Sequence, residues 1–121
     1  MKKTKIEDLY LIRGLTETGS SYTCDVELNR DHEIYKGHFP DMPVTPGVCM
    51  LHLVKSCASQ VTGRQLRYAS IRSSKFLSAI NPLEHSQLVL TFSLNESDAV
   101  QAMASVGGNP VFKLKAELTE G

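Results

Sequence analysis

The chain has 121 residues, of which 41% are hydrophobic, so we expect one compact domain over residues 1–121. Thirteen Lys and Arg residues balance thirteen Asp and Glu residues, so no net field attracts a polyanion, and nucleic acid is not expected as a partner. No window approaches eighteen apolar residues, which argues against a membrane-spanning helix.

The N-terminal segment is basic, but Glu7 and Asp8 interrupt the apolar run that a secretory signal peptide needs. The three cysteines are odd in number and lack CxxC spacing, which argues against a disulfide framework and a zinc site (Cys24, Cys49 and Cys57). A cytoplasmic location is therefore expected, with the cysteines of the helical region acting as small hydrophobic residues.

The first strands are predicted between residues 9 and 28. From Tyr22 to Leu28 apolar side chains alternate with polar ones, the period-two pattern of a strand with one wet face. A strand around Leu9 to Leu15 and a turn at Glu17 to Ser20 would complete a hairpin.

Residues 37–48, GHFPDMPVTPGV, form a segment rich in proline and glycine, which favours a rigid, non-repetitive path. This path leads into a helix predicted over Thr45 to Thr62, where Thr45 suits the N-cap and Pro46 the first helical position. Gly63 stands where a left-handed C-cap is expected. Apolar residues cover more than one face, which predicts a helix buried on most sides.

The second half of the chain repeats the strand pattern. Alternation predicts strands over Leu88 to Leu94, Val100 to Val106 and Val111 to Leu118, with a break at Gly107 to Pro110. A less regular segment, Arg67 to Leu77, supplies a further strand. One buried helix among these strands predicts an α+β protein whose antiparallel sheet wraps the helix.

His38 is the first candidate for chemistry, because an unperturbed imidazole titrates near neutrality and the rigid segment fixes its surroundings. The backbone N–H groups of Gly47 and Val48 lie in the first helical turn, lack intrahelical acceptors, and suit a carbonyl oxygen that becomes negative. A lone histidine in a loop is more often structural or solvated, but the rigid segment and the helix start favour catalysis here.

His52 is the second candidate, since a polar side chain between two leucines on a buried helix needs a partner or a pocket. The pattern by itself favours a structural histidine that is hydrogen-bonded to a backbone carbonyl. Ser56, four residues on, shares the face of His52 and would either line the same pocket or bond to the carbonyl of His52. His32 and His85 stand among charged or loop residues and are predicted to be solvated.

Segment 37–48 resembles the active-site signature of the β-hydroxyacyl-ACP dehydratases of bacterial fatty-acid synthesis. The resemblance continues in weaker form at Ser74 to Leu77, Asn81 to Glu84 and Gly108 to Leu118, which are similar to an internal strand, a turn and the closing strand of that family. It therefore extends over nearly the whole chain.

The resemblance implies a hot-dog fold, with one long central helix and two subunits joined edge to edge around acyl tunnels. A homodimer is implied, with a heterodimer or a higher oligomer as alternatives. His38 would remove the α-proton of a 3-hydroxyacyl thioester carried by acyl carrier protein, and no metal or redox cofactor is implied. The implied substrate-binding residues are Phe39, Pro46, Gly47, Val48 and Ser56.

The chain departs from the family at one catalytic position. The family has Glu or Asp fourteen residues after the histidine, whereas this chain has His52 there, with Ser56 where Gln is common. Three outcomes stay open: an imidazolium at His52 donates the proton, Asp41 supplies the carboxylate, or the protein binds acyl chains without dehydrating them. The alternatives to a dehydratase are a non-catalytic acyl-binding or heterodimer-partner subunit and an acyl thioesterase.

Overall fold

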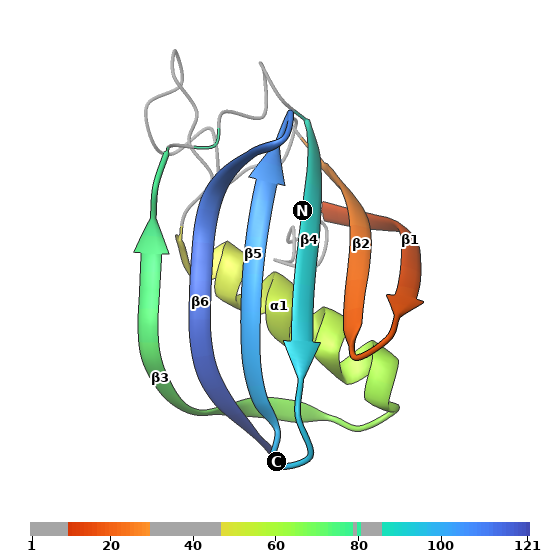
Figure 1. Ribbon diagram of the computed structural model, residues 1–121, viewed down its shortest axis with the longest axis vertical. Helices are drawn as coiled ribbons and strands as arrows, with labels where there is room; N and C mark the ends of the chain where they lie inside the picture. The colour runs from red at the N-terminus through yellow and green to blue at the C-terminus, as the bar shows by residue number, and fades with distance from the viewer. Residues whose placement is uncertain (1–9, 30–46, 79, 81–85) are drawn as a thin grey trace, which may run out of the picture.

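The computed structural model describes residues 10–29, 47–78, 80 and 86–121. In these ranges one helix, α1 (Gly47–Thr62), is combined with six strands (Figure 1). The strands are β1 (Tyr10–Thr18), β2 (Ser21–Leu28), β3 (Leu66–Phe76), β4 (Gln87–Leu94), β5 (Ala99–Val106) and β6 (Asn109–Glu120). None of the described helical residues form a segment long and apolar enough to cross a membrane.

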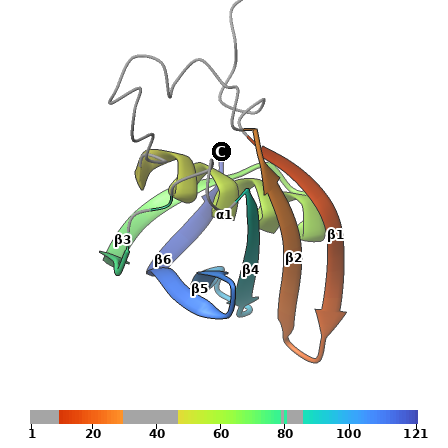
Figure 2. The same ribbon diagram turned by 90° about the horizontal axis from the view of Figure 1, so that it is seen from above.

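The six strands form one sheet in the order β1-β2-β4-β5-β6-β3, and each neighbouring pair is antiparallel. Figure 2 shows the sheet curving around α1, so that the helix lies in its concave side. Strands β1 and β3 are the two edges of the sheet, although they precede and follow the helix in sequence. The predicted α+β class, with an antiparallel sheet wrapped around one helix, is confirmed.

The predicted N-terminal hairpin is present as β1 and β2, paired from Tyr10 opposite Leu28 to Thr18 opposite Ser21. The turn is shorter than expected, because β1 continues through Thr18 and Gly19 adopts a φ of 62°. A left-handed residue at this point is what a tight antiparallel turn requires, and glycine adopts it without a steric cost.

Helix α1 ends as predicted. Gly63 follows the last helical residue with a φ of 67°, and its N–H donates to the carbonyl of Ser59 at 3.0 Å. The hydroxyl of Thr62 donates to the carbonyl of Ala58 at 2.9 Å, which satisfies another carbonyl of the last turn. The proposed N-cap and first-turn residues, Thr45 and Pro46, lie outside the described residues.

Strand β3 explains why its segment looked irregular in sequence. The pairing of β3 with β6 shifts register between Tyr68 and Ser70 and again between Ile71 and Ser73. Each shift inserts an extra residue on one side of the ladder and interrupts the period-two alternation. As an edge strand β3 also buries fewer of its side chains, so its apolar pattern is weak.

The break predicted at residues 107–110 is only two residues long. Gly107 and Gly108 have φ values of 58° and 84°, as a two-residue hairpin turn requires. Strand β6 starts at Asn109, so Pro110 lies inside the strand, opposite Ser105. A register shift between Ala104 and Ser105 accompanies the proline, which cannot donate to the ladder.

The hydrophobic core lies between the concave face of the sheet and α1. Alternate residues of the central strands point inward, and one side of α1 meets them. The largest fully buried side chains include Phe92, Phe112, Met50, Leu53 and Leu90. Of the helical side chains described from Cys49 to Thr62, only Gln60 is exposed, so α1 is buried or partly buried on most sides, as predicted.

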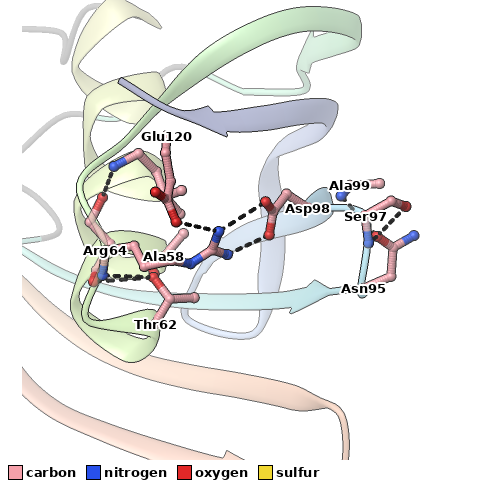
Figure 3. Close-up of polar contacts among 10 residues, drawn as sticks. Ala58, Thr62, Arg64, Asn95, Ser97, Asp98, Ala99 and Glu120 are labelled. Atoms are coloured by element: carbon pink, nitrogen blue, oxygen red, sulfur yellow. Dashed lines mark hydrogen bonds and ion pairs between the residues drawn. The ribbon is translucent and has the colours of Figure 1, made fainter.

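An ion-pair network links the residue after the helix-capping Gly63 to the β4–β5 turn and to the end of β6 (Figure 3). The guanidinium of Arg64 donates to both carboxylate oxygens of Asp98, at 2.5 and 3.1 Å, and to Glu120 at 3.1 Å. Asp98 belongs to the β4–β5 turn, where the side chain of Asn95 accepts hydrogen bonds from two backbone N–H groups. The Arg64 guanidinium holds the pKa of Asp98 below its ordinary value.

Candidate functional site

Several of the predicted site residues lie outside the described residues. These are His38, Phe39, Asp41 and Pro46. His32 and His85, which were predicted to be solvated and not part of the site, also lie outside the described residues. Gly47 and Val48 are the first two residues of α1, so their backbone N–H groups belong to its first turn, as predicted.

His52 lies on α1, five residues after Gly47 and about 7.5 Å further along the axis at 1.5 Å per residue. Its side chain is partly buried, and its Nδ1 atom lies 2.5 Å from the phenol oxygen of Tyr10. Tyr10 is the first residue of β1, so the contact joins the central helix to one edge of the sheet.

Ser56 joins the same cluster. Its Oγ atom lies 3.1 Å from the Tyr10 phenol oxygen and 3.5 Å from Nδ1 of His52. The hydroxyl of Ser56 therefore contacts Tyr10 and the His52 ring, and its predicted place in a substrate pocket stays a prediction. We name Tyr10, His52 and Ser56 the helix-edge cluster.

A second tyrosine approaches the same turn of α1 from the opposite edge. Tyr68 of β3 donates its phenol hydrogen to the backbone carbonyl of Leu51 at 2.6 Å. Burial raises the pKa of the Tyr68 phenol, and the proximity of Tyr10 adds to this shift. Tyr68 thus remains a neutral donor, and its partner is the backbone of the helix next to His52.

The helix-edge cluster can accommodate either protonation state of His52. A phenol and a hydroxyl each donate one hydrogen and accept others, so their hydrogens can reorient when the proton on Nδ1 changes. A ring that can change its protonation state without losing a hydrogen bond is suited to proton transfer. The cluster is therefore a candidate for acid or base chemistry.

Tyr10 was not identified from the sequence. The period-two pattern of the first strand places Tyr10 and Ile12 on one face, and both pack against the core. What the pattern could not supply was the wrapping of the sheet, which brings an edge residue to a helix residue 42 positions later.

The cysteines occupy the core and not the helix-edge cluster. Cys24, Cys49 and Cys57 are all buried, and none is in a disulfide. The hydrogen bond between Cys57 and Cys24 raises the pKa of the Cys57 thiol, and burial raises it further. A thiol held neutral in this way is a poor nucleophile, in agreement with the predicted hydrophobic role.

A depression of about 530 Å³ lies on the outer face of the sheet, away from α1. Its lining includes three lysines, Lys75, Lys113 and Lys115, together with Gln101 and Met103, but neither His52 nor Tyr10. This depression is therefore separate from the helix-edge cluster.

Comparison with protein families matches residues 15–109 to the ApeI-like family, described as ApeI dehydratase. The chain is 30% identical over 98 residues to the 3-hydroxyacyl-[acyl-carrier-protein] dehydratase FabZ of Levilactobacillus brevis, covering 74% of this chain and 66% of that protein. It is 27% identical over 108 residues to the FabZ of Chlamydia pneumoniae, covering 82% of this chain and 71% of that protein. The chain thus spans about two thirds of the length of these relatives.

Solved structures share the fold. The dehydratase heterocomplex ApeI:P from Xenorhabdus doucetiae matches with a TM-score of 0.78 at 18% identity, covering 91% of this chain and 97% of that one. An uncharacterized protein from Erwinia carotovora subsp. atroseptica matches with a TM-score of 0.71 at 23% identity, covering 93% and 95%. A putative thioesterase from Lactococcus lactis matches with a TM-score of 0.62 at 10% identity, covering 98% of both chains.

The wrapped sheet, the single helix and these likenesses confirm the predicted hot-dog fold. The family match covers most of the described sheet and all of α1, including His52 and Ser56. The chain is a dehydratase-like hot-dog protein that belongs to the ApeI-like family.

Proposed function

We propose that the chain removes water from a 3-hydroxyacyl thioester, carried by acyl carrier protein, to give the trans-2-enoyl thioester. The observation that carries this proposal is the position of His52. His52 lies on the helix whose first turn contains Gly47 and Val48, and its partly buried ring is hydrogen-bonded to Tyr10 of β1. The proposed proton donor and the proposed carbonyl-binding groups thus belong to one helix.

In the proposed reaction His38 accepts the proton from the α-carbon. The backbone N–H groups of Gly47 and Val48 bind the thioester oxygen while it carries negative charge. The bond between the β-carbon and its hydroxyl then breaks, and His52 supplies the proton that turns the hydroxyl into water. The electron pair left on the α-carbon forms the double bond, so the scheme needs neither a metal nor a redox cofactor.

The carrier protein enters the proposal through the relatives, whose names specify acyl-carrier-protein substrates. The proposed substrate-binding residues are those implied by the family resemblance (Phe39, Pro46, Gly47, Val48 and Ser56). The position of Ser56 is consistent with this role, because its hydroxyl contacts Tyr10 and the His52 ring.

The proposed assembly is a homodimer formed through β3. This strand is an edge of the sheet, and it and the residue that follows expose large apolar side chains: Ile71 is 44% exposed, Phe76 51% and Leu77 49%. An antiparallel pairing of two β3 strands would cover these side chains and the unpaired backbone groups of the edge. A related hot-dog chain is the alternative partner, because one structural neighbour is a dehydratase heterocomplex.

Two other functions remain as alternatives. In a non-catalytic acyl-binding subunit or heterodimer partner, the helix-edge cluster would serve packing, and a catalytic carboxylate would come from another chain. An acyl thioesterase would need a group that activates water, usually a carboxylate, and α1 contains neither Asp nor Glu between Gly47 and Thr62. The cytoplasmic location also stays a prediction, which cell fractionation would test.

Hydration of enoyl thioesters, the reverse of the proposed reaction, separates these functions. Purified full-length protein is incubated with crotonyl and longer enoyl thioesters of carrier protein, and both hydration and thiol release are followed. We expect hydration without thiol release, and His38→Ala should lower its rate by about 100-fold or more, the usual contribution of a general base. Thiol release would identify a thioesterase, and neither reaction would favour the binding role.

A further inference from the structure

The Tyr10 phenol is shared between two partners on the helix. Its oxygen lies 2.5 Å from Nδ1 of His52 and 3.1 Å from Oγ of Ser56, one helical turn later. Tyr10 reaches both from β1, with its ring tilted by 49° to the imidazole and 6.0 Å from it, measured between centroids. The His52 ring is thus held from outside its own helix.

We propose that Tyr10 is a positioning residue for His52, holding Nδ1 so that Nε2 is the ring nitrogen that exchanges a proton with the substrate. This inference rests on the proposed dehydratase function and names a residue on which that function depends. The two nitrogens of an imidazole point away from each other, so fixing one of them fixes the direction in which the other can act.

The hydrogens of the cluster can be counted in both states of the ring. When His52 is neutral with its proton on Nε2, the Tyr10 hydroxyl donates to Nδ1, and the Ser56 hydroxyl donates to the Tyr10 oxygen. When His52 is an imidazolium, Nδ1–H donates to the Tyr10 oxygen, and the Tyr10 hydroxyl donates to Ser56. In both states Nδ1 is engaged with Tyr10, so the proposal assigns the exchange of a proton with the substrate to Nε2.

The proton that His52 gives to the departing hydroxyl therefore comes from Nε2 of the imidazolium. The ring that remains is neutral and keeps its proton on Nδ1, donated to Tyr10, until Nε2 is protonated again. Tyr10 keeps its own hydrogen throughout and forms no bond with the substrate, so its contribution is to orientation and not to the chemical step.

Tyr68 provides a matched comparison in the same region. It is also a tyrosine of an edge strand whose phenol is hydrogen-bonded to α1, but it donates to the carbonyl of Leu51 and not to His52. Replacing either tyrosine by phenylalanine removes one phenol oxygen and one hydrogen bond to the helix. Of the two variants, only Tyr10→Phe removes a hydrogen bond to Nδ1 of His52.

The kinetic test compares hydration by the wild-type protein, Tyr10→Phe and Tyr68→Phe. Tyr10→Phe should lower kcat by about tenfold with little change in KM, the low end of what losing such an orienting hydrogen bond costs. Tyr68→Phe should retain kcat within about twofold, because it leaves the His52 ring held. Circular dichroism and thermal melts show whether each variant is folded.

The spectroscopic test does not depend on activity. With histidine labelled by ¹⁵N, the two ring nitrogens of His52 are identified from the signals that disappear in His52→Gln. Tyr10→Phe should shift the Nδ1 signal and change the balance of the two neutral tautomers, whereas Tyr68→Phe should leave both signals in place.

The two readouts keep the outcomes distinct. If Tyr10→Phe leaves kcat and the His52 signals unchanged, Tyr10 does not position the ring. If both tyrosine variants lower kcat equally and neither shifts the His52 signals, the effect is one of stability, and the proposal is likewise overturned. If the wild-type protein shows no hydration, the proposed function fails, and a His52 shift specific to Tyr10→Phe still establishes the contact at Nδ1.

Discussion

Position 52 determines what chemistry α1 can supply. In the family that the chain resembles, Glu or Asp is expected fourteen residues after the histidine of the signature, and this chain has His52 at that position. The two oxygens of a carboxyl group are equivalent, so either can carry the proton that is donated. The two nitrogens of an imidazole are distinct, so the hydrogen-bond partner of one nitrogen determines whether the other carries the proton. The Tyr10 hydroxyl, at 2.5 Å from Nδ1, supplies such a partner.

Substitution at position 52 should separate a catalytic from a structural histidine. His52→Gln keeps a polar side chain of related size but cannot donate a proton as an acid, so we expect the hydration rate to fall by about 100-fold. His52→Glu restores a carboxyl group that the Tyr10 hydroxyl can also hydrogen-bond, and hydration should equal or exceed the wild-type rate. Equal rates for wild type and His52→Gln would show that His52 is not the acid.

The helix-edge cluster shows how far single residues could be predicted. His52 and Ser56 were identified because they are polar residues at i and i+4 on a largely apolar helix. Their partner could not be identified, since Tyr10 is an ordinary member of a strand pattern and its relation to the helix depends on the curvature of the whole sheet. The side-chain pattern on the helix favoured a backbone carbonyl as the partner of His52, whereas the structure places the phenol oxygen of Tyr10 at 2.5 Å from Nδ1.

At the scale of elements, the sequence predicted all six strands, but not the irregularities in their pairing. The alternation in β2, β4 and β5 matched the structure to within a residue at each end, because each has one buried and one exposed face. The strand predicted over Arg67 to Leu77 is present as β3, although two register shifts interrupt its alternation, whereas the break predicted to include Pro110 was wrong there, because Pro110 is accommodated within β6 by a local shift. A bulge depends on how two strands pair, so it cannot be recognised from the side-chain alternation of one strand.

The turn between β4 and β5 is predicted to depend on an ion pair. Asp98 has a φ of 64°, which asparagine also tolerates, so Asp98→Asn removes the charge without adding backbone strain. We expect this variant to be less stable than wild type at pH 7, because Arg64 loses its two-point contact with the carboxylate. Thermal or urea unfolding of both proteins measures the difference.

The difference should depend on pH in a defined direction. The pKa of Asp98 is lowered in the folded state below the ordinary 3.8, so the pair stabilises the fold above that value and loses its effect as the pH falls through the folded-state pKa. Glu117→Gln is the matched control, since it breaks the more exposed pair with Arg72 and should change stability less. A difference for Asp98→Asn that persists undiminished at pH 2 would contradict this account.

The whole molecule is organised by a sheet whose two edges approach the central helix from opposite sides. Strand β1 contributes Tyr10 and strand β3 contributes Tyr68, and both phenols are hydrogen-bonded to the same region of α1. The sequence predicted the fold class because six amphipathic strands and one largely apolar helix have few ways to bury their surfaces. It did not predict the strand order, which depends on long-range pairing that alternation does not encode.

The proposed dimer makes a prediction at this scale. Wild-type protein should have the mass of two 13.4 kDa chains in light scattering after size exclusion, and Ile71→Asp should dissociate it by placing charge on the exposed edge. Leu11→Asp is the matched control, because Leu11 is 54% exposed on the opposite edge strand and should leave the dimer intact. Dissociation by Leu11→Asp alone would place the interface on β1 instead.

The central claim is proton transfer to and from an acyl thioester, and hydration in D₂O tests it most directly. Wild-type protein is incubated with an enoyl thioester of carrier protein, and the product is analysed by mass spectrometry. The account predicts a 3-hydroxyacyl thioester with deuterium on the α-carbon and its thioester bond intact, and no such product with His38→Ala. Recovery of the unchanged enoyl thioester, or of a free acid, from the folded wild-type protein would contradict it.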